Sequence, residues 1–172
     1  MPGALHLVSR FFGSLVPAGE PRADRQWIAD NLTDGEQQVW RTMSRQDRRH
    51  AAGVARRVER ALGNEATRPV LAAALLHDCG KTVSGLGTYG RVIATLSVKL
   101  AGTEQALAWR ETRGFTRRVG LYVLHPELGA DLLGLAGSAP LTVAWTAEHH
   151  LPPDQWTVPA AVGDALKAAD DD

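Results

Sequence analysis

A histidine and an aspartate stand side by side in this chain, directly after a long apolar run. The run covers residues 70–76, and His77, Asp78, Gly80 and Lys81 follow it. A segment that is apolar on every side is typical of a core helix, because it leaves no face for water. A buried carboxylate is costly unless a cation meets it, and imidazole and carboxylate both bind divalent metal ions. The sequence therefore predicts a metal site here, with Gly80 ending the helix and Lys81 placed to meet an anion.

Four other histidines occupy positions that suit the same site. His50 heads a line of apolar residues spaced four apart on a predicted helix, so it faces the core rather than water. His125 lies at a junction between two predicted helices, where its side chain can point into a cleft. His149 and His150 end another predicted helix. Because they are adjacent they point in different directions, so both can bind metal only in a tight cluster or around two metal positions.

The last predicted helix offers two candidate carboxylates, Asp164 and Asp170. Asp170 continues a line with Val162 and Leu166, each four residues from the next. Asp164 shares its face with Lys167, which favours exposure to water. Helical periodicity therefore selects Asp170 as the carboxylate that points into the core.

The elements that must position these residues are all predicted to be helices. Asp34 can cap one helix, and Ser44 with Asp47 resembles a capping box at the start of a long one. Thr67 and Pro69 are typical of the start of the central helix. The chain has no clean alternation of apolar and polar residues and no Asn-Gly or Asp-Gly turn. We therefore expect an all-α fold, with several helices around the central one.

Residues 84–90 contain a formal G-x-G-x-x-G pattern. The pattern follows a predicted helix and not a strand, so it lacks the context of a dinucleotide-binding loop. We interpret this segment as a flexible lid or a plain loop, and the sequence leaves open whether residues 85–100 close over the site. Apolar helices are expected at residues 91–100 and 103–113.

The bulk composition is that of one globular domain with a short appendage. The chain has 172 residues and a formal net charge of zero, so bulk charge does not favour a nucleic-acid partner. Its single cysteine, Cys79, excludes an internal disulfide and suits a reducing, cytoplasmic location.

Residues 1–22 form a predicted amphipathic helix and linker ahead of a domain at residues 23–172. Leu5, Val8, Phe12 and Leu15 recur at spacings of three and four, which is typical of an amphipathic helix. This helix can pack back on the domain. The alternative is peripheral membrane contact through residues 5–16, with Arg10 at the lipid head groups. The segment lacks the basic start and uninterrupted apolar run of a signal peptide.

The order of these histidines and aspartates resembles that of the HD superfamily of metal-dependent phosphohydrolases. The similar motifs are RRHAAGVARRVERAL at residues 48–62, LLHDCGK at residues 75–81 and HPELGADLL at residues 125–133. The resemblance covers residues 48–170 and implies a compact helical bundle. It also implies one metal ion on His50, His77, Asp78 and Asp170, and a second on His125 with His149 or His150, bridged by Asp78.

The resemblance implies hydrolysis of a phosphoester or phosphoanhydride by a metal-bound hydroxide. Asp78 and Lys81 would be the catalytic residues, with Lys81 on a phosphate oxygen. Arg49 and Arg91 are further candidates for substrate phosphate, with no motif behind them. Mixed imidazole and carboxylate ligands suit one or two ions of Mn, Fe, Co, Ni or Zn.

One departure from the family pattern narrows the expected substrate. Members that degrade cyclic-di-GMP follow the paired histidines with E-x-x-D-G-x-G-Y-P, and this chain continues with Leu151, Pro152 and Pro153. The chain looks more like the stand-alone members, which implies a nucleotide-like or small phosphorylated substrate. Two other functions stay open, namely a non-catalytic signalling or binding module of this fold, and a di-iron oxygenase.

Overall fold

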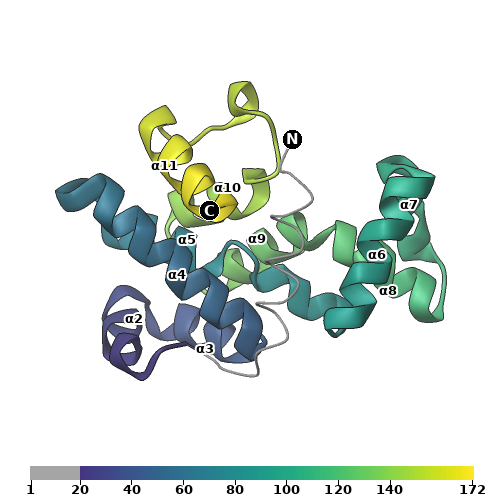
Figure 1. Ribbon diagram of the computed structural model, residues 1–172, viewed down its shortest axis with the longest axis horizontal. Coiled ribbons are helices and arrows are strands. Elements are labelled where there is room, and N and C mark those ends of the chain that lie inside the picture. The colour runs from purple at the N-terminus through teal and green to yellow at the C-terminus, as the bar shows by residue number, and fades with distance from the viewer. Residues whose placement is uncertain (1–19) are drawn as a thin grey trace.

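The computed structural model describes residues 20–172, and these residues are helical with no strand (Figure 1). The predicted all-α fold is confirmed. The predicted helix and membrane contact at residues 5–16 lie outside the described residues. The α-helices are α2 (Arg25–Asn31), α3 (Asp34–Thr42), α4 (Arg45–Leu62), α5 (Arg68–Leu76), α6 (Thr88–Ala101), α7 (Thr103–Ala108), α8 (Gly114–Val123), α9 (His125–Leu135), α10 (Pro140–Glu148) and α11 (Ala160–Asp171). Short 3-10 helices are η1 (Arg22–Asp24), η2 (Gly63–Glu65), η3 (Cys79–Ser84), η4 (Trp109–Glu111) and η5 (Pro153–Gln155).

Helix α5 is the centre of the main core. All seven apolar residues from Val70 to Leu76 are buried, as the apolar run predicts. The helix begins after Thr67 with Pro69 in its first turn, and it contacts α4, α10, α2 and α3. Because α5 is covered on every side, His77 and Asp78, which follow its last residue, are also buried.

The helix starts are set by side-chain caps, with one difference from the prediction. Thr33, and not Asp34, is the N-cap of α3. It forms a full capping box with Glu36, and Asp34 is the first helical residue. Ser44 caps α4 by accepting from the Asp47 amide, but the Asp47 carboxylate turns to the Ser44 hydroxyl instead of completing a box. That orientation leaves the Asp47 carboxylate able to bind a second partner.

Gly80 does not end the central helix, which corrects the prediction. Helix α5 ends at Leu76, and Gly80 lies inside η3. A Cβ atom at Gly80 would lie 2.0 Å from the carbonyl oxygen of His125 and 2.6 Å from the amide nitrogen of Gly129. Glycine is needed here because η3 and α9 approach each other backbone to backbone, and this approach brings His125 close to Asp78.

Helices α6, α7 and α8 form a lobe, residues 88–123, that stands apart from the other helices (Figure 1). The lobe has its own small core of Leu86, Ala94 and Val119, on which Trp109 and Tyr122 pack. The predicted loop at residues 84–90 is partly helical, because η3 extends to Ser84 and α6 begins at Thr88.

Among the described residues, none of the helices combines the length and the hydropathy needed to cross a lipid bilayer.

Candidate metal centre

Five histidines and two aspartates from distant parts of the chain meet where α4, α5, α9, α10 and α11 come together. His50 comes from the first half of α4 and Asp170 from the last turn of α11. The remaining ligand candidates all lie at helix ends. His77 and Asp78 follow α5, His125 begins α9, and His149 and His150 follow α10. The structure thus brings together all seven residues that the sequence proposes as metal ligands.

Three of these imidazoles are held by the carbonyl three residues earlier in the chain. The Nδ1 atoms of His77, His125 and His149 donate to the carbonyl oxygens of Ala74, Tyr122 and Thr146, at 3.0, 2.7 and 2.9 Å. Carbonyls in the last turn of a helix have no partner within the helix, so a histidine just beyond it can satisfy one. Since a carbonyl only accepts, Nδ1 carries the proton and Nε2 keeps its lone pair.

The Nε2 atoms of His77 and His149 are buried without a hydrogen-bond partner. The two residues are only 2% and 1% exposed, so water does not provide a partner from bulk solvent. Leaving a buried polar atom unsatisfied costs about 1–3 kcal/mol. A lone pair fixed in this way on each of two neighbouring rings, 5.3 Å apart between centroids, fits a metal ion as the missing partner.

Asp78 lies between the two sets of imidazoles. Its Oδ2 atom is 3.5 Å from Nε2 of His77 and 2.5 Å from Nζ of Lys81. Its Oδ1 atom is 3.5 Å from Nε2 of His125 and 3.8 Å from Nε2 of His149. Each carboxylate oxygen thus faces a different group of ring nitrogens, which is the arrangement of a bridging ligand.

The first group consists of His50, His77 and Asp78, whose ligand atoms lie within 4.8 Å of one another. Asp170 borders this group, because its Oδ1 atom is 2.9 Å from Nε2 of His50 and 3.5 Å from Nε2 of His77. Three nitrogen or oxygen ligands with a fourth close by can hold a divalent cation.

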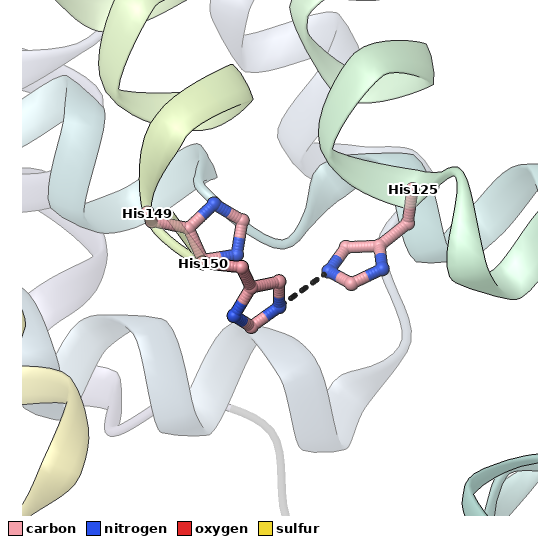
Figure 2. Close-up of side chains that lie close together, drawn as sticks. All are labelled: His125, His149 and His150. Carbon is pink, nitrogen blue, oxygen red and sulfur yellow. Dashed lines mark hydrogen bonds between the residues drawn. The ribbon is translucent and has the colours of Figure 1, made fainter. Parts of the chain in front are cut away.

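The second group consists of His125, His149 and His150, again with ligand atoms within 4.8 Å of one another. Figure 2 shows the two adjacent histidines at the end of α10 and His125 on α9, with their rings gathered in one place. The Nε2 atoms of His125 and His150 are 3.3 Å apart. His149 is buried and His150 is exposed, so this group reaches from the interior to the surface.

The charges around the site keep Asp78 and two of the histidines in the forms that bind metals. Burial alone would raise the pKa of Asp78, but Lys81 and His77 hold it well below its usual value. Burial lowers the pKa of His149 well below the ordinary value, and His77 and His150 add to this effect. Burial and His125 lower the pKa of His150 to about 4. Asp78 is therefore a carboxylate and both imidazoles are neutral near pH 7.

The two carboxylates at the first group, Asp78 and Asp170, favour a positive charge beside them. Burial alone would lower the pKa of His77, but the Asp78 and Asp170 carboxylates outweigh it and raise the pKa. Oδ2 of Asp78 and Oδ1 of Asp170 each lie 3.5 Å from Nε2 of His77. Positive charge between them is therefore favoured, whether it comes from a proton on His77 or from a metal ion.

The predicted substrate-binding residues occupy three different environments. Lys81 is paired with Asp78 at the site, and although burial would lower its pKa, the Asp78 charge raises it. Arg91 donates from two nitrogens to the Asp47 carboxylate, at 2.6 and 2.9 Å, and from a third to the Leu86 carbonyl. Arg49 is exposed on α4 beside His50. Substrate contact by these three residues stays a prediction.

Sequence reasoning missed the residues that orient the imidazoles. The Glu148 carboxylate, next to His149 in the chain, accepts from the amide and hydroxyl of Thr157 instead, at 2.7 and 2.6 Å. Tyr122 supplies both the carbonyl for Nδ1 of His125 and a ring stacked on that imidazole, with centroids 5.7 Å apart. The sequence signal that could have indicated these carbonyls was the position of each histidine just beyond the end of a predicted helix.

No family model, curated protein or solved structure matches the chain. The chemistry of this centre therefore follows from its own geometry.

Proposed function

We propose that this protein is a metal-dependent phosphohydrolase with two divalent cations at the Asp78 carboxylate. The observation that carries the proposal is the pair of buried Nε2 atoms of His77 and His149, which have no hydrogen-bond partner and lie close to Asp78. A structural core histidine would have both ring nitrogens satisfied. His77 and His149 each form a hydrogen bond through Nδ1 and none through Nε2, which supports a role as metal ligands.

One cation would be held by the first group, with Asp170 as the additional carboxylate. The other would be held by the second group, with Oδ1 of Asp78 as its carboxylate ligand. Both would then have nitrogen and oxygen ligands, which suits Mn, Fe, Co, Ni or Zn better than Mg.

The reaction class follows from what such a centre supplies. A pair of divalent cations lowers the pKa of bound water and neutralises the charge on phosphoryl oxygens. The chain contributes the positions of the ligands, because Nδ1 of three imidazoles is fixed on backbone carbonyls. Lys81 contributes an ammonium group beside Asp78, mostly buried with its side chain 13% exposed, which can donate a proton in a hydrogen bond to a phosphate oxygen.

The motifs that resemble the HD superfamily favour the same reaction, on a nucleotide-like or small phosphorylated substrate. His150, the exposed member of the second group, would be the ligand that such a substrate meets first. The size and chemistry of the substrate are left to the activity screen.

Metal content is the first test of the proposal. Elemental analysis of the purified protein after reconstitution should give about two ions per chain, and His125→Ala should reduce the number to one. Asp78→Asn should reduce it further, because both groups share this carboxylate. Glu127→Gln is the matched control, since Glu127 is an exposed carboxylate two residues from His125 and its loss should leave the metal content unchanged. A reconstituted wild-type protein without metal would refute the proposal.

Activity is the second test. The metal-loaded protein should hydrolyse at least one member of a panel of nucleotides, phosphodiesters and phosphomonoesters. Loss of a metal ligand or of a group that stabilises charge in the transition state typically reduces the rate by about a hundredfold or more. His77→Ala and Lys81→Ala should therefore both hydrolyse the substrate much more slowly. A protein with two bound ions that binds these compounds without turnover would instead indicate a binding module.

A further inference from the structure

Helix α6 exposes an apolar face to solvent. Tyr89, Val92, Ile93, Leu96 and Leu100 are between 37% and 90% exposed, and they follow one another at spacings of three, one, three and four residues. At about 100° per residue, these five side chains fall within an arc of roughly 100° on one side of the helix. We call this arc the α6 stripe.

The α6 stripe is not the face that packs inside the lobe. Ala94, which belongs to the small core of the lobe, is fully buried, and Val98 packs on that core. Helix α6 therefore has two apolar faces, one towards α7 and α8 and one towards solvent. A continuous exposed face of five large apolar residues is unusual for a helix with no partner, and it marks a surface that binds something.

The lobe that carries the stripe is basic, although the whole chain is neutral. Residues 88–123 contain six Arg or Lys and two Glu, a net charge of +4, while the chain has a formal net charge of zero. Arg91 is neutralised by Asp47. The exposed basic side chains of the lobe are Lys99, Arg110, Arg113, Arg117 and Arg118. Positive charge is thus concentrated in the lobe that carries the exposed apolar helix.

We propose that the α6 stripe binds an anionic membrane surface. A helix lying in the plane of a membrane buries an apolar face at the level of the head groups and needs basic residues beside that face. The lobe combines an exposed apolar helix face with a net positive charge. A second copy of the chain is a poorer partner, because two lobes that each carry a net positive charge would repel each other across the contact.

The N-terminal segment is also a poorer partner for the stripe. Residues 1–19 contain Arg10 and no acidic residue, so they offer no charge that would complement the lobe. Their apolar residues suit the same membrane surface instead. The proposed contact lies on the lobe and contains none of the metal ligands, so it does not depend on the phosphohydrolase proposal.

Vesicle flotation of the full chain tests this proposal. The protein should float with vesicles that contain about one third phosphatidylglycerol in phosphatidylcholine, and not with phosphatidylcholine alone, because the basic lobe needs anionic lipid. The double variant Ile93→Ser with Leu96→Ser removes two side chains from the stripe. Its partition coefficient should fall by about tenfold or more, given the apolar area lost. Arg113→Gln with Arg117→Gln should also weaken binding.

The matched control is Leu135→Ser on α9, because Leu135 is 89% exposed and lies outside the lobe. It should float like the wild type. Helical content by circular dichroism, and metal content, should be unchanged in all variants because the substituted residues are exposed.

Three results would overturn the proposal. The first is a wild type that does not bind anionic vesicles. The second is equal vesicle binding of the wild type and the Ile93/Leu96 variant. If, in that case, Phe11→Ser with Phe12→Ser abolishes flotation, membrane binding belongs to the N-terminal segment and not to the stripe. The third is a wild-type dimer that the stripe variant converts to a monomer without any vesicle binding. That result would assign the stripe to a second copy of the chain.

Discussion

Each of the three histidines at helix ends uses one ring nitrogen for position and leaves the other for the site. Nδ1 of His77, His125 and His149 donates to a carbonyl of the preceding turn, so the ring cannot rotate without losing that bond. The Nε2 lone pair is then directed by the backbone of the helix itself. This arrangement needs no carboxylate behind the imidazole, and the Glu148 carboxylate accepts from Thr157 instead.

Glu148 should therefore be dispensable for metal binding. Glu148→Gln should keep the full metal content, since its carboxylate holds Thr157 and not a ligand. It should lower the free energy of unfolding by about 0.5–1.5 kcal/mol, because a charge-assisted pair of hydrogen bonds becomes neutral. Elemental analysis and urea denaturation would measure both effects. Loss of metal in this variant would mean that Glu148 acts on the neighbouring His149.

At the scale of elements, two contacts set the geometry of the site. The close approach of η3 and α9 at Gly80 and Gly129 places His125 opposite Asp78. The ion pair between Arg91 and Asp47 joins α6 to the start of α4. One contact depends on the absence of side chains and the other on a buried pair of charges.

Two glycines on α9 should respond in opposite ways to replacement by alanine. A Cβ atom at Gly129 would lie 2.9 Å from Cγ2 of Thr146 and 3.1 Å from the Gly80 amide nitrogen, so Gly129→Ala should destabilise the protein by about 1–3 kcal/mol. Gly134 has no atom within 4 Å of that position, and Gly134→Ala should stabilise α9 by about 0.5–1 kcal/mol. Thermal melting of both variants would measure these changes, and equal effects would contradict the proposed close approach.

The Arg91–Asp47 pair should contribute measurable coupling between α6 and α4. Both groups are largely buried, with side-chain exposures of 17% and 9%, and the guanidinium binds both carboxylate oxygens. A double-mutant cycle of Arg91→Ala and Asp47→Ala should give about 1–2 kcal/mol of coupling in the free energy of unfolding. Lys99 lies on the exposed side of the same helix, so Lys99→Ala should leave the free energy of unfolding unchanged. Coupling near zero would mean that other contacts fix α6.

At the scale of the whole molecule, the metal centre joins distant parts of the described chain. His50 and Asp170 are 120 residues apart and in direct contact. The remaining ligand candidates come from three further helix junctions. A cation bound here would link α4, α5, α9, α10 and α11, so metal binding should be coupled to the stability of the main core. The α6–α8 lobe supplies none of the ligand candidates and contacts the site through Tyr122, which orients His125.

Removal of metal should therefore lower the melting temperature. At a metal concentration about one hundred times the dissociation constant, binding to the folded state alone contributes about 2.7 kcal/mol. For a domain of this size that corresponds to a shift of roughly 5–11 °C. Calorimetry with and without a chelator would measure the difference, and in His77→Ala the difference should be largely lost. A chelator with no effect on the wild type would contradict a metal in the core.

Much of the fold and of the candidate site could be predicted from local sequence. The apolar run at residues 70–76 predicts a helix buried on all sides, and the spacing of Val162, Leu166 and Asp170 predicts an inward carboxylate. Both predictions rest on the helical period, which local sequence determines. The same holds for the all-α fold. The positions of the histidines at helix ends and on buried faces suggested a metal site, the resemblance to the HD superfamily implied the full ligand set, and the structure brings these residues together.

The tertiary structure alone decided which partners these residues meet. Gly80 was expected to end a helix, but the backbone of α9 lies against it. Arg91 forms an ion pair with Asp47 of α4, a partner that no local pattern in the sequence indicates. These outcomes depend on contacts between residues far apart in the chain. The sequence by itself thus determined the helices and the faces that they bury. Packing of those faces decided which side chains meet, because the partner across a contact leaves no periodic signal in the sequence.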